Sequence, residues 1–192
     1  MSKSVLVVGL GNPGSRYRGT RHNMGFEVAD AFASELGMSL SRHHQGLTGT
    51  ARLGEQTIHV LLPQTFMNHS GIAVADFVRY NPVDYPAGLI VIHDELDLEP
   101  GVVRVKLGGG LAGHNGLKSI AHLLGTQNFV RIRIGIGRPL DQSAVVDFVL
   151  GRPRPEDRVE LDLAVHRGVD AVRDVIELGP ERAMTQHNQR AR

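Results

Sequence analysis

The chain has 192 residues, 41% of them hydrophobic, which is enough for one domain with a substantial buried core. It contains no cysteine, so disulfides, thiolate nucleophiles and cysteine-ligated zinc are excluded. The formal net charge of +1 is too small to indicate a polyanionic partner by itself.

Short runs of apolar and β-branched residues predict five buried strands. In chain order the strands cover residues 4–8, 57–62, 89–93, 102–107 and 130–136. Apolar residues at helical spacing predict helices between and after them, over residues 20–37, 70–80, 117–124 and 156–178. This alternation predicts an α/β fold with a twisted, mixed but mostly parallel sheet flanked by helices, as in phosphorylases and hydrolases.

The organisation of the chain indicates a single domain over residues 1–192, because no repeat or long linker divides it. The first predicted strand is short and is interrupted by Gly9, a pattern that favours neither a signal peptide nor a membrane span. We therefore expect a cytoplasmic protein that does not contact a membrane. Residues 138–155, with three prolines and one glycine, predict a flexible loop before the helix at 156–178.

A glycine-rich turn, Gly9-Leu10-Gly11-Asn12-Pro13-Gly14, follows the first strand and matches the G-x-G-x-x-G pattern of dinucleotide-binding proteins. That fold requires a helix that opens at the glycines and a second strand that ends in an acid about twenty residues later. Here a loop over residues 16–20 intervenes. A nucleotide-dependent oxidoreductase stays an alternative that NAD(P) binding would test, but the pattern favours a turn that presents the side chain of Asn12.

His22 lies at the start of the first predicted helix, where the helix dipole disfavours imidazolium and keeps the ring able to accept a proton. A lone histidine is more often structural than catalytic. A catalytic base also needs a partner for its second ring nitrogen, and Asp94 at the end of the third strand is our candidate. Asp94, Glu95, Asp97 and Glu99 could instead form a metal site, but a short turn cannot make all four converge, so no metal is predicted.

Two further amides stand at the starts of helices. Asn68 precedes the helix at 70–80, where it could be a helix cap, and Asn115 follows a glycine run that lacks the Gly-Lys-Ser/Thr of a phosphate-binding loop. With Asn12, His22 and Asp94 these residues make a set without a serine, cysteine or metal nucleophile. Such a set indicates attack by water assisted by a base, with amides that bind an acyl or peptide carbonyl.

Basic residues gather in two stretches without any acid, residues 1–26 and 102–140. If the two stretches meet in the fold, they would form a positive face suited to a phosphate backbone. The alternative is a solvated basic surface that is balanced by acids elsewhere.

In combination, these motifs closely resemble the bacterial peptidyl-tRNA hydrolase family. The resemblance includes Thr20-Arg21-His22-Asn23 and Gly113-His114-Asn115-Gly116-Leu117. The full set of matching blocks covers residues 8–14, 17, 20–23, 65–68, 70–71, 93–97, 106–110, 113–117, 131–137 and 148–151. Because these blocks follow one another through most of the chain, the set is highly specific.

The resemblance implies an enzyme that hydrolyses the ester between a peptide and the terminal ribose of tRNA and so recycles tRNA from aborted translation. In that reaction His22 would activate water and Asp94 would hold His22. The implied enzyme is a cytoplasmic monomer without metal or cofactor, whose partner is peptidyl-tRNA. A non-catalytic RNA-binding relative of the same fold is the alternative.

The resemblance also implies two further groups of site residues. The substrate-binding residues would be Asn12, Tyr17, Met67, Asn68, His114 and Asn115, with Tyr17 beside the 3′-terminal nucleotide. The tRNA-binding residues would be Arg104, Lys106 and Arg133. Two residues depart from the family pattern: Ala112 stands where glycine is frequent, and Arg104 where lysine is common.

Overall fold

Seven strands form one mixed sheet in the computed structural model of the protein, which describes residues 3–189. The order across the sheet is β2 (Ser41–His43), β3 (Gly46–Leu53), β4 (Gln56–Pro63), β1 (Ser4–Gly9), β5 (Leu89–Glu95), β7 (Val130–Gly135) and β6 (Val103–Leu107). Strands β4, β1, β5 and β7 are parallel, and antiparallel strands complete both edges. The predicted α/β fold is confirmed, while residues 1–2 and 190–192 of the predicted domain lie outside the described residues.

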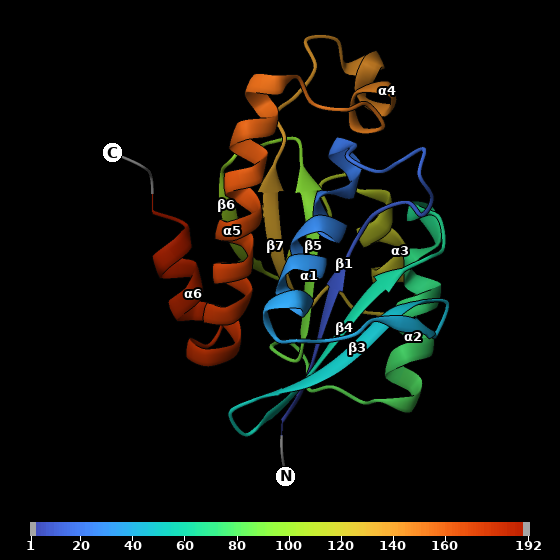
Figure 1. Cartoon of the computed structure of the whole chain (residues 1–192), viewed down its shortest axis with the longest axis vertical. Coiled ribbons are helices and arrows are strands. Elements are labelled where there is room, and N and C mark those ends of the chain that lie inside the picture. Colours follow the sequence, from blue (N-terminus) through green and yellow to red (C-terminus); the bar gives the residue numbers. More distant parts are fainter. Residues whose placement is uncertain (1–2, 190–192) are drawn as a thin grey trace.

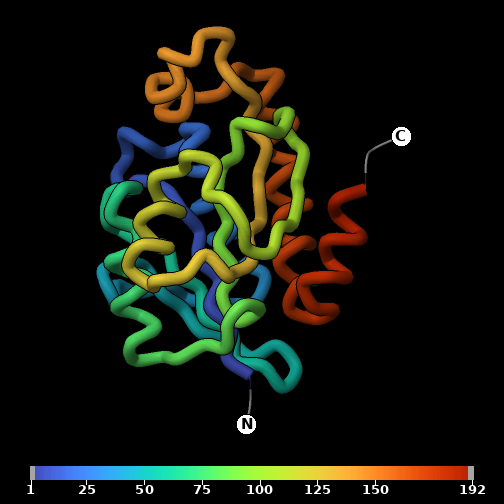
Figure 2. The backbone as a smooth tube through the Cα atoms, turned by 180° about the vertical axis from the view of Figure 1, so that it is seen from behind, coloured from blue at the N-terminus to red at the C-terminus, as the bar shows by residue number. Residues whose placement is uncertain are grey.

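Helices cover both faces of the sheet. One face carries α1 (Met24–Glu35) and α5 (Pro155–Leu178), with α6 (Pro180–His187) beside them (Figure 1). The opposite face carries α2 (Ser70–Tyr80) and α3 (Asn115–Leu124), seen from behind in Figure 2. Of the helices described, none combines the length and apolar character needed to cross a bilayer.

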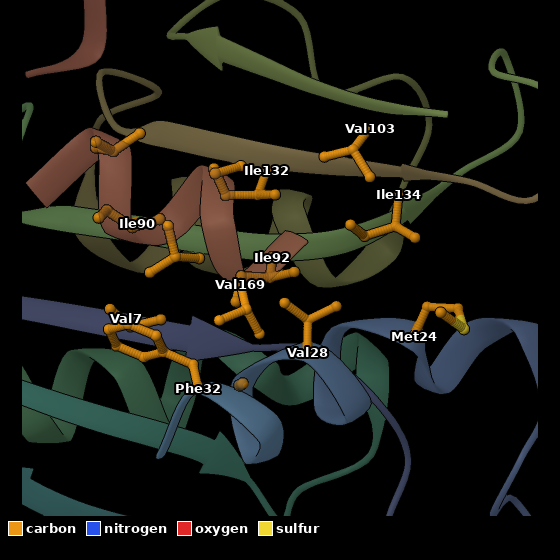
Figure 3. Close-up of a cluster of buried hydrophobic side chains, with 14 of the residues drawn as sticks. Val7, Met24, Val28, Phe32, Ile90, Ile92, Val103, Ile132, Ile134 and Val169 are labelled. Carbon is orange, nitrogen blue, oxygen red and sulfur yellow. The ribbon is translucent and has the colours of Figure 1, made fainter. Parts of the chain in front are cut away.

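Alternating side chains of the strands divide the core into two clusters. Val7 and Ile92 point toward α1 and α5, where they pack with Val28, Phe32 and Val169 (Figure 3). Their neighbours along the strands point to the other face and pack under α2 and α3. Because β1 and β5 are buried on both faces, their sequences are continuous apolar runs, which is why they were predictable.

Two strands were not predicted, because many of their residues are polar or small and most are exposed or only partly buried. β2 is a three-residue exposed strand, and β3 contains two glycines and two threonines. Pairing with β4 forms β3 despite this weak propensity, and the pair extends along the whole of β4.

The predicted helix at 20–37 is correct in place but not in its first turn. A short 3-10 helix, η1 (Arg21–Asn23), precedes α1. The hydroxyl of Thr20 donates to Tyr17 O at 2.7 Å and so does not cap the helix. Gly37 ends the helix with a φ of +67°, the left-handed conformation that a glycine adopts at low cost.

The segment 138–155, predicted as a loop, contains the 3-10 helix η3 (Gln142–Ala144) and the short helix α4 (Val145–Val149). Asp141 begins this structure, since its carboxylate accepts from Ser143 N at 2.9 Å. Five residues are too few to show helical periodicity, so only the prolines and the glycine of this segment were recognisable, and these indicate a loop. In Figure 1, α4 lies apart from the two helical layers, beyond the carboxyl ends of β5 and β7.

Glycines let the start of α1 rest directly on the sheet. A Cβ at Gly9 would lie 2.3 Å from Gly25 O, and a Cβ at Gly25 would lie 2.3 Å from Ile92 O. Phe26 N, a free amide of the first turn of α1, donates to Leu10 O at 3.0 Å. This close approach fixes η1, and with it His22, at the ends of β1 and β5.

Candidate active site

A cavity of about 470 Å³ lies at the carboxyl ends of the parallel strands, the edge where α/β sheets place their sites. Seven of the predicted site residues line it: Asn12, His22, Met67, Asn68, Asp94, His114 and Asn115. Tyr17 lies outside this lining, and its ring packs edge-on against that of Phe66, with 6.2 Å between centroids. Phe66 does line the cavity and is largely exposed, so Tyr17 stands at the rim.

His22 and Asp94 are in direct contact. The distance from His22 Nδ1 to Asp94 Oδ2 is 2.8 Å, and the two side chains are 13% and 2% exposed. A carboxylate only accepts hydrogen bonds, so Nδ1 carries the proton in the neutral ring and Nε2 keeps a free lone pair. One end of the imidazole is thus anchored in the protein, and the ring lines the cavity.

Asp94 accepts a second hydrogen bond from His114, whose Nε2 is 2.8 Å from Oδ1. At its other side, His114 Nδ1 accepts from Gly116 N and Leu117 N, at 3.2 and 3.4 Å, and so caps α3. These amides fix the tautomer of His114, because Nδ1 must accept and Nε2 must donate. Both ring nitrogens of this predicted substrate-binding residue therefore contact the protein itself.

The ionisation of the pair is set by burial and by mutual attraction. Burial lowers the pKa of His22, but the charge and hydrogen bond of Asp94 outweigh it, so the pKa of His22 is raised. Burial would raise the pKa of Asp94, yet His22 and His114 hold it well below the usual carboxyl range. Asp94 thus shifts the pKa of His22 in the direction opposite to the one expected from a helix dipole.

Asn12 joins three segments at the floor of the cavity. Its Oδ1 accepts from Met67 N at 2.7 Å, and its backbone exchanges two hydrogen bonds with the side chain of Asn23, at 2.8 and 3.0 Å. Within the described residues no hydrogen bond engages Asn12 Nδ2. Asn68 and Asn115 are exposed and line the same cavity, so three amides surround the space beside His22.

His22, Asp94 and His114 could also hold a metal ion, because one ligand atom from each lies within 4.8 Å of the others. The hydrogen bonds of Asp94 to both rings account for this closeness without a metal. Glu95, Asp97 and Glu99, considered above for a metal site, are not part of this group. Glu95 pairs with Arg133 at 2.5 Å and Asp97 pairs with Arg138 at 2.5 Å. The acids thus diverge, as expected for a short turn.

Basic residues alternate along β6 and β7, so that they share one face of the sheet edge. Arg104 is opposite Arg133 in the register, and Lys106 is opposite Arg131. Lys106 and Arg133 line a cavity of about 250 Å³ beside the glycine-rich loop. Arg104 does not line this cavity, and its Nη1 donates to His187 O at the end of α6, at 3.1 Å. The structure thus brings together two of the three predicted tRNA-binding residues.

Two buried arginines were not predicted as site residues. Arg131 is 1% exposed, and its guanidinium donates to Gly109 O at 2.8 Å and to Gly110 O, which holds the glycine-rich loop that leads to His114. Arg21 is 8% exposed and contacts the segment that contains α4. An arginine in a sequence is ordinarily taken as surface charge, and only its adjacency to the His22 motif could have drawn attention to Arg21.

The cavity also has an apolar side that the sequence did not reveal. It is formed by Val145, Val146, Val149 and Leu150, from α4 and the residue after it. The cavity therefore joins a polar half around His22 to an apolar half, as expected of a site for an acyl group with side chains.

Comparisons with known proteins agree on one family. The family sequence model described as Peptidyl-tRNA hydrolase matches residues 6–192. The peptidyl-tRNA hydrolase of Syntrophotalea carbinolica is 46% identical over 186 residues, covering 96% of this chain and 97% of the relative. That of Thiobacillus denitrificans is 49% identical over 184 residues, covering 94% and 88%. The crystal structure of peptidyl-tRNA hydrolase from Acinetobacter baumannii has a TM-score of 0.91 and 38% identity, covering 98% of this chain and 96% of that one.

Proposed function

The chain belongs to the peptidyl-tRNA hydrolase family, and on that premise we propose that it hydrolyses the ester between peptide and tRNA with His22 as the general base. The observation that carries the proposal is the hydrogen bond of 2.8 Å from His22 Nδ1 to Asp94 Oδ2. It leaves Nε2 as the proton acceptor at a cavity large enough for an acyl group.

The reaction then needs no covalent intermediate on the protein. Nε2 of His22 takes a proton from water while the water oxygen bonds to the ester carbonyl carbon. The tetrahedral intermediate collapses when the carbon–oxygen bond to the ribose breaks, and the imidazolium of His22 returns the proton to that ribose oxygen. The products are a peptide with a free carboxyl group and a tRNA with a free terminal hydroxyl. Asp94 stabilises the imidazolium between the two steps.

The amides around the cavity have the chemistry to bind the peptidyl part. Asn12 Nδ2 is a donor that no described protein group engages, and Asn68 and Asn115 offer both donors and acceptors. A donor aimed at the carbonyl oxygen would stabilise the negative charge that develops there, an effect typically worth about 3 kcal/mol per donor. We assign Asn12 and Asn68 to the peptidyl carbonyl groups and Asn115 to the water or ester.

Recognition of tRNA is assigned to the basic face of β6 and β7. Lys106 and Arg133 line one small cavity and would contact phosphates, with Arg104 farther along the same face. Tyr17 and Phe66, at the rim, present rings on which the terminal base can stack.

We further propose that the enzyme acts as a cytoplasmic monomer without metal or cofactor. The support is that every residue of the proposed mechanism lies around one cavity within one chain. Size-exclusion chromatography with light scattering tests the monomer, and a higher mass at working concentration would contradict it.

The decisive assay uses N-acetyl-aminoacyl-tRNA and the matching unblocked aminoacyl-tRNA, with protein that has been dialysed against EDTA. We expect release of the N-acetyl amino acid and sparing of the unblocked substrate. Activity that depends on added metal would contradict the water mechanism. Binding of tRNA without hydrolysis would indicate a non-catalytic relative of the fold.

A further inference from the structure

The apolar side of the cavity belongs to the α4 segment, which is hydrogen-bonded to an arginine from another part of the chain. Besides the adjoining η3, the element that α4 contacts most is η1, the turn that carries Arg21 and His22. In Figure 1 the α4 segment stands beyond the carboxyl ends of β5 and β7, apart from the helices that cover the two faces of the sheet. Val149 belongs to the core cluster under α1 and α5, and Val145 and Phe148 pack against that cluster. The position of α4 over the cavity therefore rests on this packing and on its contacts with η1.

Arg21 supplies these contacts from both its backbone and its side chain. Arg21 N donates to Gly151 O at 3.0 Å, and Nη1 donates to Phe148 O and Arg152 O, at 3.1 and 3.3 Å. The guanidinium also stacks on the Phe148 ring at 4.0 Å. In return, Arg152 Nε donates to Arg18 O at 3.2 Å. These hydrogen bonds, which we call the Arg21 clasp, join two short segments around the buried guanidinium.

The partners of the Arg21 guanidinium are suited to fixing the position of the α4 segment rather than to neutralising a nearby acid. No described carboxylate is hydrogen-bonded to Arg21, and burial lowers the pKa of its guanidinium. Carbonyl oxygens and an aromatic face satisfy it instead, and these have fixed directions. A planar guanidinium matches that arrangement, whereas a lysine ammonium can neither span both carbonyls in one plane nor stack in the same way.

We propose that Arg21 is a positioning residue that holds α4 as the apolar wall of the acyl site and thereby sets the preference for apolar side chains next to the ester. This inference rests on the proposed function. Arg21 and His22 are consecutive in one 3-10 turn, so the base and the wall are fixed to the same rigid element. The wall residues Val149 and Leu150 then meet the substrate at a defined distance from His22.

The test is Arg21→Lys, with Arg167→Lys as the matched control. Arg167 Nη1 also joins two segments through a carbonyl, Gly101 O at 2.9 Å, but lies outside the cavity. For Arg21→Lys we expect KM for N-acetyl-leucyl-tRNA to rise about tenfold and KM for N-acetyl-glycyl-tRNA to rise less, with kcat and its pH profile unchanged. Amide hydrogen exchange of residues 145–151 should quicken about tenfold. The control should change none of these.

Phe148→Leu is the second variant, because it removes the stacked ring and keeps the carbonyls. It should change KM and exchange in the same direction by a smaller factor, and it decides the question if Arg21→Lys fails to fold. Unchanged exchange and an unchanged leucyl-to-glycyl KM ratio would overturn the proposal, as would a shifted pH profile, which would mean that Arg21 acts through His22. Amide exchange does not depend on turnover. An inactive wild-type protein would therefore contradict the proposed function, while the exchange rates would still test whether Arg21 holds α4.

Discussion

Replacement of Asp94 by asparagine is informative because His114 dictates which way the new amide must face. His114 Nδ1 accepts the amides at the start of α3, so Nε2 carries a proton and requires an oxygen acceptor. The asparagine oxygen is therefore expected to face His114, which leaves its NH₂ group toward His22 Nδ1. His22 must then place its proton on Nε2, the nitrogen that should accept a proton from water.

The expected loss is the whole contribution of general-base catalysis, about 10² to 10⁴ in kcat. A thousandfold loss corresponds to about 4 kcal/mol in the barrier. Adding His114→Ala to Asp94→Asn releases the amide, which can then turn its oxygen to His22, so the double variant should recover about tenfold over the single one. Asp76→Asn is the control, because His44 Nδ1 and Asp76 form a similar pair at 2.9 Å outside the cavity.

Single-turnover release of the N-acetyl amino acid measures these effects, with urea unfolding to verify that each variant is folded. The reasoning is refuted if Asp94→Asn retains activity within tenfold of wild type. It is also refuted if His114→Ala lowers the activity of the single variant further, since the orientation of the amide would then not be the cause.

Three further outcomes follow from the same geometry. Because Asp94 raises the pKa of His22, the acid limb of kcat/KM should lie above the ordinary histidine range near 6.5, with activity lost as pH falls through it; a limb below that range would contradict the pKa direction. Lys106→Ala should reduce the slope of log kcat/KM against log salt concentration by about one. Arg104→Ala should reduce this slope by less, because the Arg104 guanidinium already donates to a carbonyl at the end of α6; equal effects would show that this hydrogen bond breaks when tRNA binds. Ala112 has a φ of +52°, so Ala112→Gly should raise the free energy of unfolding by about 0.5–1 kcal/mol in urea titrations, and no gain would mean that the loop relaxes.

The central fold was predictable because its strands are buried on both faces. β1 and β5 are apolar runs in the sequence, and the parallel arrangement follows from the helices between them. β3 was not, since its half-exposed residues have little strand propensity and depend on β4. α4 was missed for a related reason: its stability comes from a cap and from Arg21, and neither produces a periodic pattern.

Candidate site residues could be proposed from the sequence where an unusual side chain lies at the end of an element, as with Asn12, His22 and Asp94. Their partners were harder to predict, because a sequence does not show which polar atoms are already engaged. His114 was expected to bind substrate, yet its nitrogens contact α3 and Asp94. Arg131 and Arg21 look like surface charges until the carbonyls around them are known.

The glycine string after β1 shows how one pattern can serve two different structures. In dinucleotide-binding folds such glycines admit a pyrophosphate. Here Gly9 leaves room for the backbone of Gly25, and a Cβ at Gly11 would lie 2.6 Å from the Phe26 ring. The space created by the missing side chains is filled by α1. Because that contact carries η1 onto the end of β5, the glycines place His22 within hydrogen-bond distance of Asp94, the pair that we propose for catalysis.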